Sequence, residues 1–109
     1  MSVVLPTYAD EDRIKQDINE VGTTDTVILN HITRANEDAS SKMEALFLNN
    51  FDENNPEAFF VQITTELATA EYWVKTNGTQ EALNQRDLVL KKAQDILIQR
   101  FQPVESRVT

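Results

Sequence analysis

The chain has 109 residues, of which 40% are hydrophobic and 26% are charged, the size and composition of one globular domain. Its net charge of −8 argues against general electrostatic binding to DNA or to an anionic membrane, because both need a basic surface. It has no cysteine, which excludes disulfides and thiolate metal sites. The start MSVVLPTYADED lacks the basic and apolar regions of a signal peptide, so we expect assembly in the cytosol.

A short helix is predicted first, over residues 9–21. Its first turn is acidic at residues 10–12, which suits the positive end of the helix dipole. Gly22 is expected to provide a left-handed C-cap after its last turn. The apolar residues that recur at helical spacing, and that we expect to be buried, are Ile14, Ile18 and Val21.

A long second helix is predicted over residues 25–49, opening at Thr24 or Asp25. One narrow apolar stripe follows it, with alanine at its centre. The stripe consists of Ile28, Ile32, Ala35, Ala39, Met43 and Leu46. Small side chains let another helix approach closely. We expect that neighbour to be the third or fourth helix of the same chain, with a subunit contact as the alternative.

The third helix is predicted over residues 56–77, with Asn55 as N-cap, Pro56 at the first helical position and Gly78 as C-cap. It carries two apolar lines. The line expected to face the core is Phe59, Phe60, Ile63, Leu67, Ala70 and Val74. The opposite line is Val61, Ala68 and Tyr72. Either this helix is central and covered on both sides, or its second line is a contact between subunits, which makes those three residues candidate interface residues.

The fourth helix is predicted over residues 79–101, followed by Pro103, which should stop it, and by a tail at 102–109. Its apolar stripe covers nearly half of its circumference. The stripe consists of Leu83, Leu90, Leu97 and Phe101, widened by Ala82, Val89, Ala93 and Ile96. Short links between helices imply antiparallel neighbours. The predicted fold is therefore all-α, a single domain over 1–109 built as a bundle of about four helices with a short extended C-terminal tail.

The sequence offers no set of residues for catalysis or metal binding. His31 is the one histidine, and the acidic stretch at 52–55 lacks the ligand spacing of a calcium loop. Neither glycine has a companion that would make a phosphate-binding loop. We therefore predict no enzyme activity, no catalytic residue, no cofactor and no metal.

The order of these features resembles the small helical head–tail connector proteins of tailed bacteriophages, also called adaptor or head-completion proteins. The resemblance covers about residues 7 to 101 and rests on pattern and order. The matching segments are TYADEDRIKQDI, DTVILNHITRANEDASSKMEALF, PEAFFVQITTELATAEYWVKT and LKKAQDIL. They resemble an aromatic-led entry to a short helix, a long helix with alanines four apart, a Pro-initiated helix and a final helix. The FDENNPE loop departs from the aromatic-Pro connection of many members, which leaves the subfamily open.

The resemblance implies a structural virion protein of the neck, assembled in the host cytoplasm. Copies would form a ring, dodecameric by resemblance, that docks on the portal protein and extends the DNA channel toward the tail. The ring would present a platform for the next neck or tail-completion protein. DNA would pass through without specific binding, which suits the acidic balance. The candidate portal or neck contacts are Lys91, Lys92, Arg100, Val104, Arg107 and Val108.

A protein of another class is the alternative: a stand-alone acidic helical binding module, such as a chaperone or antitoxin that covers a basic partner. Residues 1–57 hold twelve Asp and Glu against four Lys and Arg, whereas residues 58–109 hold six of each. A module of this kind is expected to be a monomer or dimer. A connector is expected to form large rings, alone or on the portal.

Overall fold

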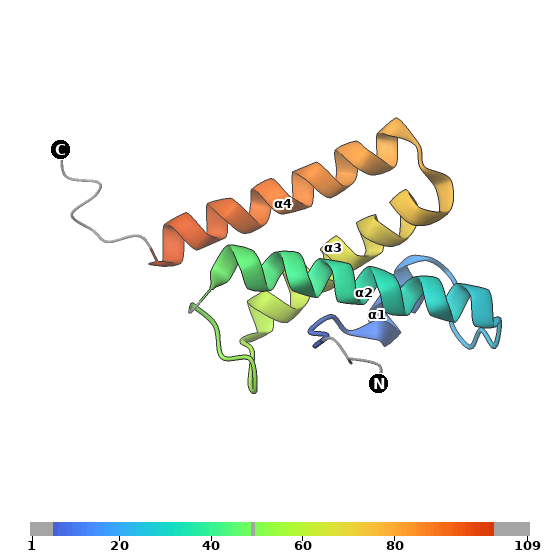
Figure 1. Cartoon of the computed structure of the whole chain (residues 1–109), viewed down its shortest axis with the longest axis horizontal. Coiled ribbons are helices and arrows are strands. Elements are labelled where there is room, and N and C mark those ends of the chain that lie inside the picture. Colours follow the sequence, from blue (N-terminus) through green and yellow to red (C-terminus); the bar gives the residue numbers. More distant parts are fainter. Residues whose placement is uncertain (1–5, 49, 102–109) are drawn as a thin grey trace, which may run out of the picture.

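The described part of the chain folds into four α-helices and no strand in this computed structural model, which describes residues 6–48 and 50–101 (Figure 1). The helices are α1 (Glu11–Asp17), α2 (Thr26–Phe47), α3 (Ala58–Asn77) and α4 (Gln80–Phe101). The predicted all-α class and four-helix bundle are confirmed. The predicted tail at 102–109 and the stop at Pro103 lie outside the described residues.

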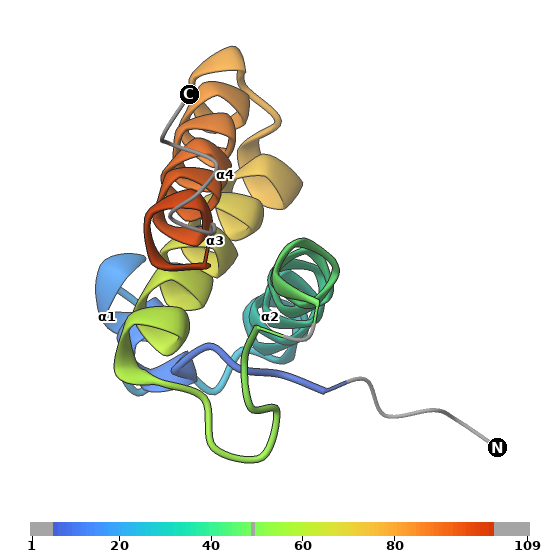
Figure 2. The same ribbon diagram turned by 90° about the vertical axis from the view of Figure 1, so that its left-hand side faces the viewer.

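Helix α3 is the centre of the bundle. It packs against α1, α2 and α4, whereas α2 and α4 barely touch one another. Figure 2 shows α4 lying along α3, with α1 and α2 on either side of the lower part of α3. Its buried side chains point in several directions and are Phe60, Ile63, Thr64, Thr65, Leu67, Ala68, Ala70, Glu71 and Tyr72. Of the two alternatives for the two apolar lines, the central helix covered on both sides is the one observed.

The alanine-centred stripe of α2 lies inside this bundle. Its middle residues are all at most 1% exposed, and they are Ile32, Ala35, Ala39 and Met43. Ile28 and Leu46, at the two ends, are partly buried against the same core. Because α2 makes its most extensive contact with α3, the small side chains admit a helix of the same chain, as expected.

Helix α1 is shorter than predicted. It ends at Asp17, and Asn19 takes the left-handed conformation with φ of 60°. The N–H of Glu20 then reaches back to the carbonyl of Lys15 at 2.8 Å, which closes the helix. Asparagine tolerates this conformation, so the chain turns before Gly22. The predicted burial of Val21 is wrong as a result, because this side chain is 72% exposed beyond the helix.

The other helix ends follow their capping residues. The Asp25 side chain accepts a hydrogen bond from the N–H of Val27 at 2.9 Å, which confirms the start of α2. Gly78, with φ of 62°, caps α3 as predicted. The start of α3 differs, because Glu57 is its N-cap and Pro56 precedes the helix. Asn55 instead donates its N–H to the carbonyl of Asp52 at 3.2 Å, within the loop.

An N-terminal strap, residues 7–10, crosses the surface between α2 and α3. Three consecutive backbone N–H groups of the strap donate to buried or partly buried side-chain oxygens of these helices. The bonds join Tyr8 to Ser40 Oγ (2.8 Å), Ala9 to Asn36 Oδ1 (3.1 Å) and Asp10 to Thr65 Oγ1 (2.9 Å). Asn36 Nδ2 also donates to the carbonyl of Ala9 at 3.3 Å. The strap thus adds a polar layer to one side of the core.

Candidate functional site

The three candidate interface residues on α3 do not form one exposed surface. Ala68 is fully buried and Tyr72 is only 6% exposed. The ring of Tyr72 meets that of His31 edge-on, with centroids 6.4 Å apart, so α2 covers this side of α3. Val61 alone is partly exposed. The expectation that Ala68 and Tyr72 offer a subunit contact is wrong, since both lie in the core of their own chain.

The candidate portal contacts on α4 are partly occupied within the chain. Lys92 Nζ lies 3.1 Å from both carboxylate oxygens of Glu66. The guanidinium of Arg100 lies 4.1 Å above the centroid of the Phe59 ring and 3.7 Å from Glu57 Oε2. Lys91 is exposed and has no ion pair within the described residues. Val104, Arg107 and Val108 fall outside those residues.

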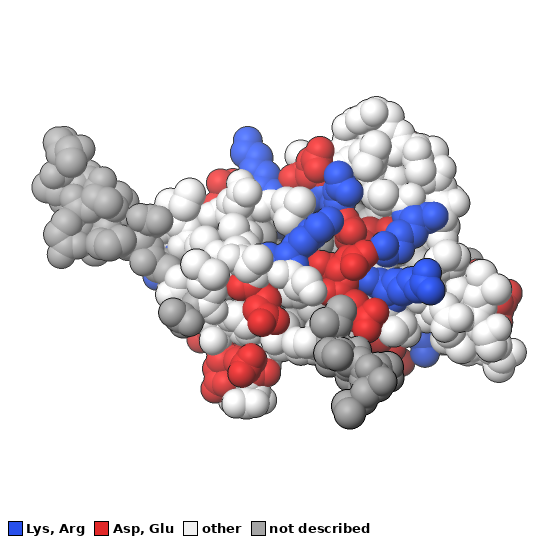
Figure 3. Space-filling model, viewed as in Figure 1, with Lys and Arg blue, Asp and Glu red and all other residues white. Residues whose placement is uncertain are grey.

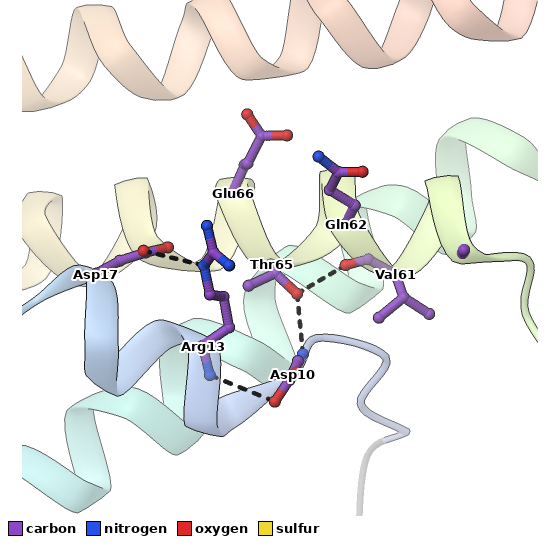
Figure 4. A pocket seen from close by; sticks show the side chains of 8 residues that line it. Asp10, Arg13, Asp17, Val61, Gln62, Thr65 and Glu66 are labelled. Atoms are coloured by element: carbon purple, nitrogen blue, oxygen red, sulfur yellow. Dashed lines mark hydrogen bonds and ion pairs between the residues drawn. The ribbon is translucent and has the colours of Figure 1, made fainter. Parts of the chain in front are cut away.

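An open groove of about 570 Å³ lies between α1 and α3 (Figure 4). Charges of both signs and two apolar side chains line it. The lining residues are Asp10, Arg13, Asp17, Ala58, Val61, Gln62, Thr65 and Glu66. Val61, the one predicted interface residue that is partly exposed, lies in this groove.

Hydrogen bonds from α1 and α3 fix the floor of this groove. Thr65 Oγ1 donates to the carbonyl of Val61 at 2.7 Å and accepts the strap N–H of Asp10. Arg13 Nε pairs with Asp17 Oδ1 at 3.3 Å, one helical turn away. In Figure 4, Gln62 and Glu66 project from α3 toward α4. The groove therefore offers fixed polar groups beside a small apolar area, an arrangement that suits contact with a protein surface.

A buried carboxylate joins the three long helices on another face. Glu71 of α3 is only 5% exposed, and its Oε1 lies 3.0 Å from Lys42 Nζ of α2 and 3.6 Å from Arg86 Nε of α4. Lys75 pairs with Asp38 beside it. Figure 3 shows Lys and Arg side chains gathered beside Asp and Glu side chains on the face that α2 and α4 present in this view. Because Lys42 and Arg86 come from different helices, the cluster fixes α4 relative to α2.

The sequence analysis predicted neither the ion pairs around Glu71 nor the hydrogen bonds that hold the N-terminal strap. Glu71 stands between two residues of the apolar lines, and a carboxylate at such a position is the signal that was available. Asn36 and Ser40, four residues apart beside the alanine stripe, offered a similar signal for the strap. The aromatic contacts of the strap were also missed. The Tyr8 ring packs edge-on against Phe51 and Phe60, with centroid distances of 5.4 and 5.6 Å.

Among the described residues, no group of three or more His, Cys, Asp or Glu side chains is placed to hold a metal ion. His31 is partly buried against Tyr72. No helix in residues 6–48 and 50–101 combines the length and apolar character needed to cross a membrane. No family model, no curated protein and no solved structure matches this chain.

Proposed function

We propose that the chain is a structural subunit of a phage head–tail connector, which forms a ring on the portal protein and extends the DNA channel toward the tail. The resemblance over residues 7 to 101 supports this proposal. The helix order is compatible with it: a short helix, a long alanine-centred helix, a helix before which proline stands, and a final helix. The same resemblance places the protein in the neck of the virion.

The observation that carries the proposal is the groove along α3. Ring assembly needs a heterologous contact, in which one surface of each copy meets a different surface of the next. The groove offers apolar contact through Ala58 and Val61 and hydrogen bonding through the exposed amide of Gln62. We assign the lateral contact of the ring to this groove, in place of the buried Ala68 and Tyr72.

The charges of the chain fit a channel through which DNA slides. A net charge of −8 repels the phosphate backbone and keeps packaged DNA from binding to the channel wall. Lys92 and Arg100 are paired within the chain, so Lys91 is the described basic residue of α4 that we assign to the portal or neck contact. Val104, Arg107 and Val108 of the tail complete that proposed contact. The ring would present a binding surface for the next neck or tail-completion protein.

Electron microscopy of the chain mixed with the portal protein of the same virus tests the proposal. Ala58 is exposed at the first turn of α3, so Ala58→Trp fills the groove without entering the core. We expect rings on the portal with the natural chain and loss of rings with Ala58→Trp. Ala45→Trp is the matched control, because Ala45 is also exposed, on α2, and lies outside the groove. This variant should form rings like the natural chain.

Two results would contradict the proposal in different ways. Rings that survive Ala58→Trp would place the lateral contact elsewhere. A natural chain that stays free of the portal and instead captures a basic protein would favour the acidic binding module. The genes beside this one provide a second test, because portal and capsid reading frames are expected next to a connector gene.

A further inference from the structure

The solvent-facing side of α4 carries four side chains without a partner in the described part of the chain. Leu88 and Ile98 are 61% and 52% exposed, although both are large and apolar. Lys91 and Asp95, between them, are exposed and form no ion pair within residues 6–48 and 50–101. The four side chains lie on the opposite side of α4 from Ala93, which is fully buried.

These four residues form one line along the helix. They are separated by three, four and three positions, the spacing of the contact line in a coiled coil. On a helical wheel they fall within about 80° of one another. We call this line, Leu88, Lys91, Asp95 and Ile98, the outer seam of α4.

The outer seam is complementary to itself in one orientation. Read along the chain it is apolar, basic, acidic and apolar. If a second α4 lies antiparallel across a twofold axis at position 93, Leu88 of each copy faces Ile98 of the other. In the same arrangement, Lys91 of each copy faces Asp95 of the other. A parallel pair would instead set lysine against lysine and aspartate against aspartate, which is unfavourable.

Helix α4 is accessible to such a partner. Figures 1 and 2 both place it at an edge of the molecule, with α3 on its inner side. It has little contact with α2 and no substantial contact with α1. A second α4 can therefore approach the outer seam along its length without meeting another helix.

We propose that the outer seam of α4 is a docking surface for a second copy of this chain, in an antiparallel pair. The charge pattern identifies the occupant, because the seam is matched by its own reverse. The pair is weak, since it consists of four exposed apolar side chains and two ion pairs at a surface. Salt weakens it further by screening those ion pairs.

This inference is independent of the proposed ring. A twofold contact uses the same surface on both copies and closes on itself, so it cannot by itself build a ring. The groove along α3 is lined by residues of α1, its N-cap and α3, and it includes no residue of the outer seam. The isolated chain should thus be a dimer at high concentration even if it forms rings on the portal, and mass alone does not separate a connector from a binding module.

Charge reversal provides the test, read out by sedimentation velocity across a concentration series. Lys91→Asp places aspartate against Asp95 of the partner, and Asp95→Lys places lysine against Lys91. Each variant alone should associate at least about tenfold more weakly than the natural chain. An equimolar mixture of the two variants should associate again, because each seam is then matched by the other. Arg34→Asp is the control, since Arg34 is an exposed cation on α2 without an ion pair among the described residues.

The mixture separates a lost contact from a damaged fold, and circular dichroism checks the helicity of each variant. Restored association in the mixture, with Arg34→Asp behaving like the natural chain, supports the seam. Single variants that still associate like the natural chain would overturn it, as would a natural chain that is monomeric throughout the series. A mixture that stays monomeric although both variants are folded would also overturn it. Ring formation on the portal addresses the proposed function separately.

Discussion

Helices α2 and α4 are both 22 residues long and both carry an apolar stripe, narrow on α2 and broad on α4, yet the fold uses them differently. α2 lies against α3 on one side and against α1 and the N-terminal strap on another, and its stripe is buried. α4 lies against α3, and the side chains it buries are the small Ala82, Val89 and Ala93. The leucines that define the predicted stripe of α4, Leu83, Leu90 and Leu97, stay partly exposed.

The difference shows that burial depends on how many elements cover a helix and less on how apolar the helix is. The strap and α1 provide α2 with a second cover that α4 lacks. The apolar surface left on α4 can be removed from water only by another molecule, at about 25 cal/mol for each Å² buried. We call α1, α2, α3 and the strap the enclosed half of the bundle. Substitutions in the enclosed half should therefore mainly change the free energy of unfolding. Substitutions on the exposed side of α4 should mainly change association with another molecule.

The largest effect is expected from Ala68→Asp, in the enclosed half. Ala68 is fully buried on α3, so the substitution places an unpaired charge in the core. We expect a loss of about 3–5 kcal/mol in the free energy of unfolding, measured by urea denaturation. Ala45→Asp, on the exposed side of α2, should change it by less than about 0.5 kcal/mol. Equal effects of the two substitutions would show that α3 is open on this side.

The same substitution, alanine to leucine, at a buried position of each helix compares the packing of α2 and α4 directly. Ala39→Leu in α2 should cost about 1–3 kcal/mol, because Ala39 is fully enclosed and the extra atoms have no space. Ala82→Leu in α4 should cost less, because Ala82 borders an open pocket of about 390 Å³ beside Trp73. Thermal unfolding of both variants measures the difference. A larger loss for Ala82→Leu would reverse our ranking of the two helices.

The smallest effect concerns the strap and appears only at high pH. Burial and the hydrogen bond from the Tyr8 hydroxyl to Glu44 Oε2 (3.2 Å) raise the pKa of Tyr8 from 10.0 to about 12. Burial raises the pKa of Tyr72 as well. The unfolded chain loses the phenolic proton near pH 10, whereas the folded chain keeps it. The stability that these raised pKa values contribute is therefore fully present below pH 10 and is lost as the pH rises toward 12.

Tyr8→Phe tests this assignment, because phenylalanine keeps the ring contacts with Phe51 and Phe60 and cannot ionise. Urea denaturation midpoints should fall less steeply between pH 10 and 12 for Tyr8→Phe than for the natural chain. Phenolate absorbance should show one tyrosine fewer that ionises late. An unchanged slope would assign the effect to Tyr72 or to other groups.

The sequence was sufficient to predict the helices where periodicity and caps agree. α2 and α4 begin within a residue of the expected positions, because Asp25 and Thr79 cap them through their side chains. α1 was predicted too long, since the left-handed turn at Asn19 overrides the apolar spacing that ends in Val21. The apolar pattern of α3 identified both of its lines, but a pattern cannot show which line is covered by the same chain.

The candidate site was harder to predict than the fold. The groove along α3 brings Asp10 and Arg13 beside Val61 and Glu66, residues about fifty positions apart in the chain. Their proximity depends on how α1 packs on α3, and single-sequence periodicity carries no such information. The polar residues Asn36 and Thr65 were overlooked for a related reason, since each accepts a hydrogen bond from the strap, a segment distant from it in the sequence.

The strap has a consequence for how this sequence can change over evolution. Ser40, Asn36 and Thr65 hold it through peptide groups, which every residue except proline supplies in full. A substitution at Ala9 by any residue other than proline therefore leaves the bonds intact, whereas one at Asn36 removes two of them. Divergent descendants of this protein can vary the strap itself while the receiving side chains stay fixed. Related sequences should then be recognised more readily by the side chains on α2 and α3 that bind the strap than by the strap itself.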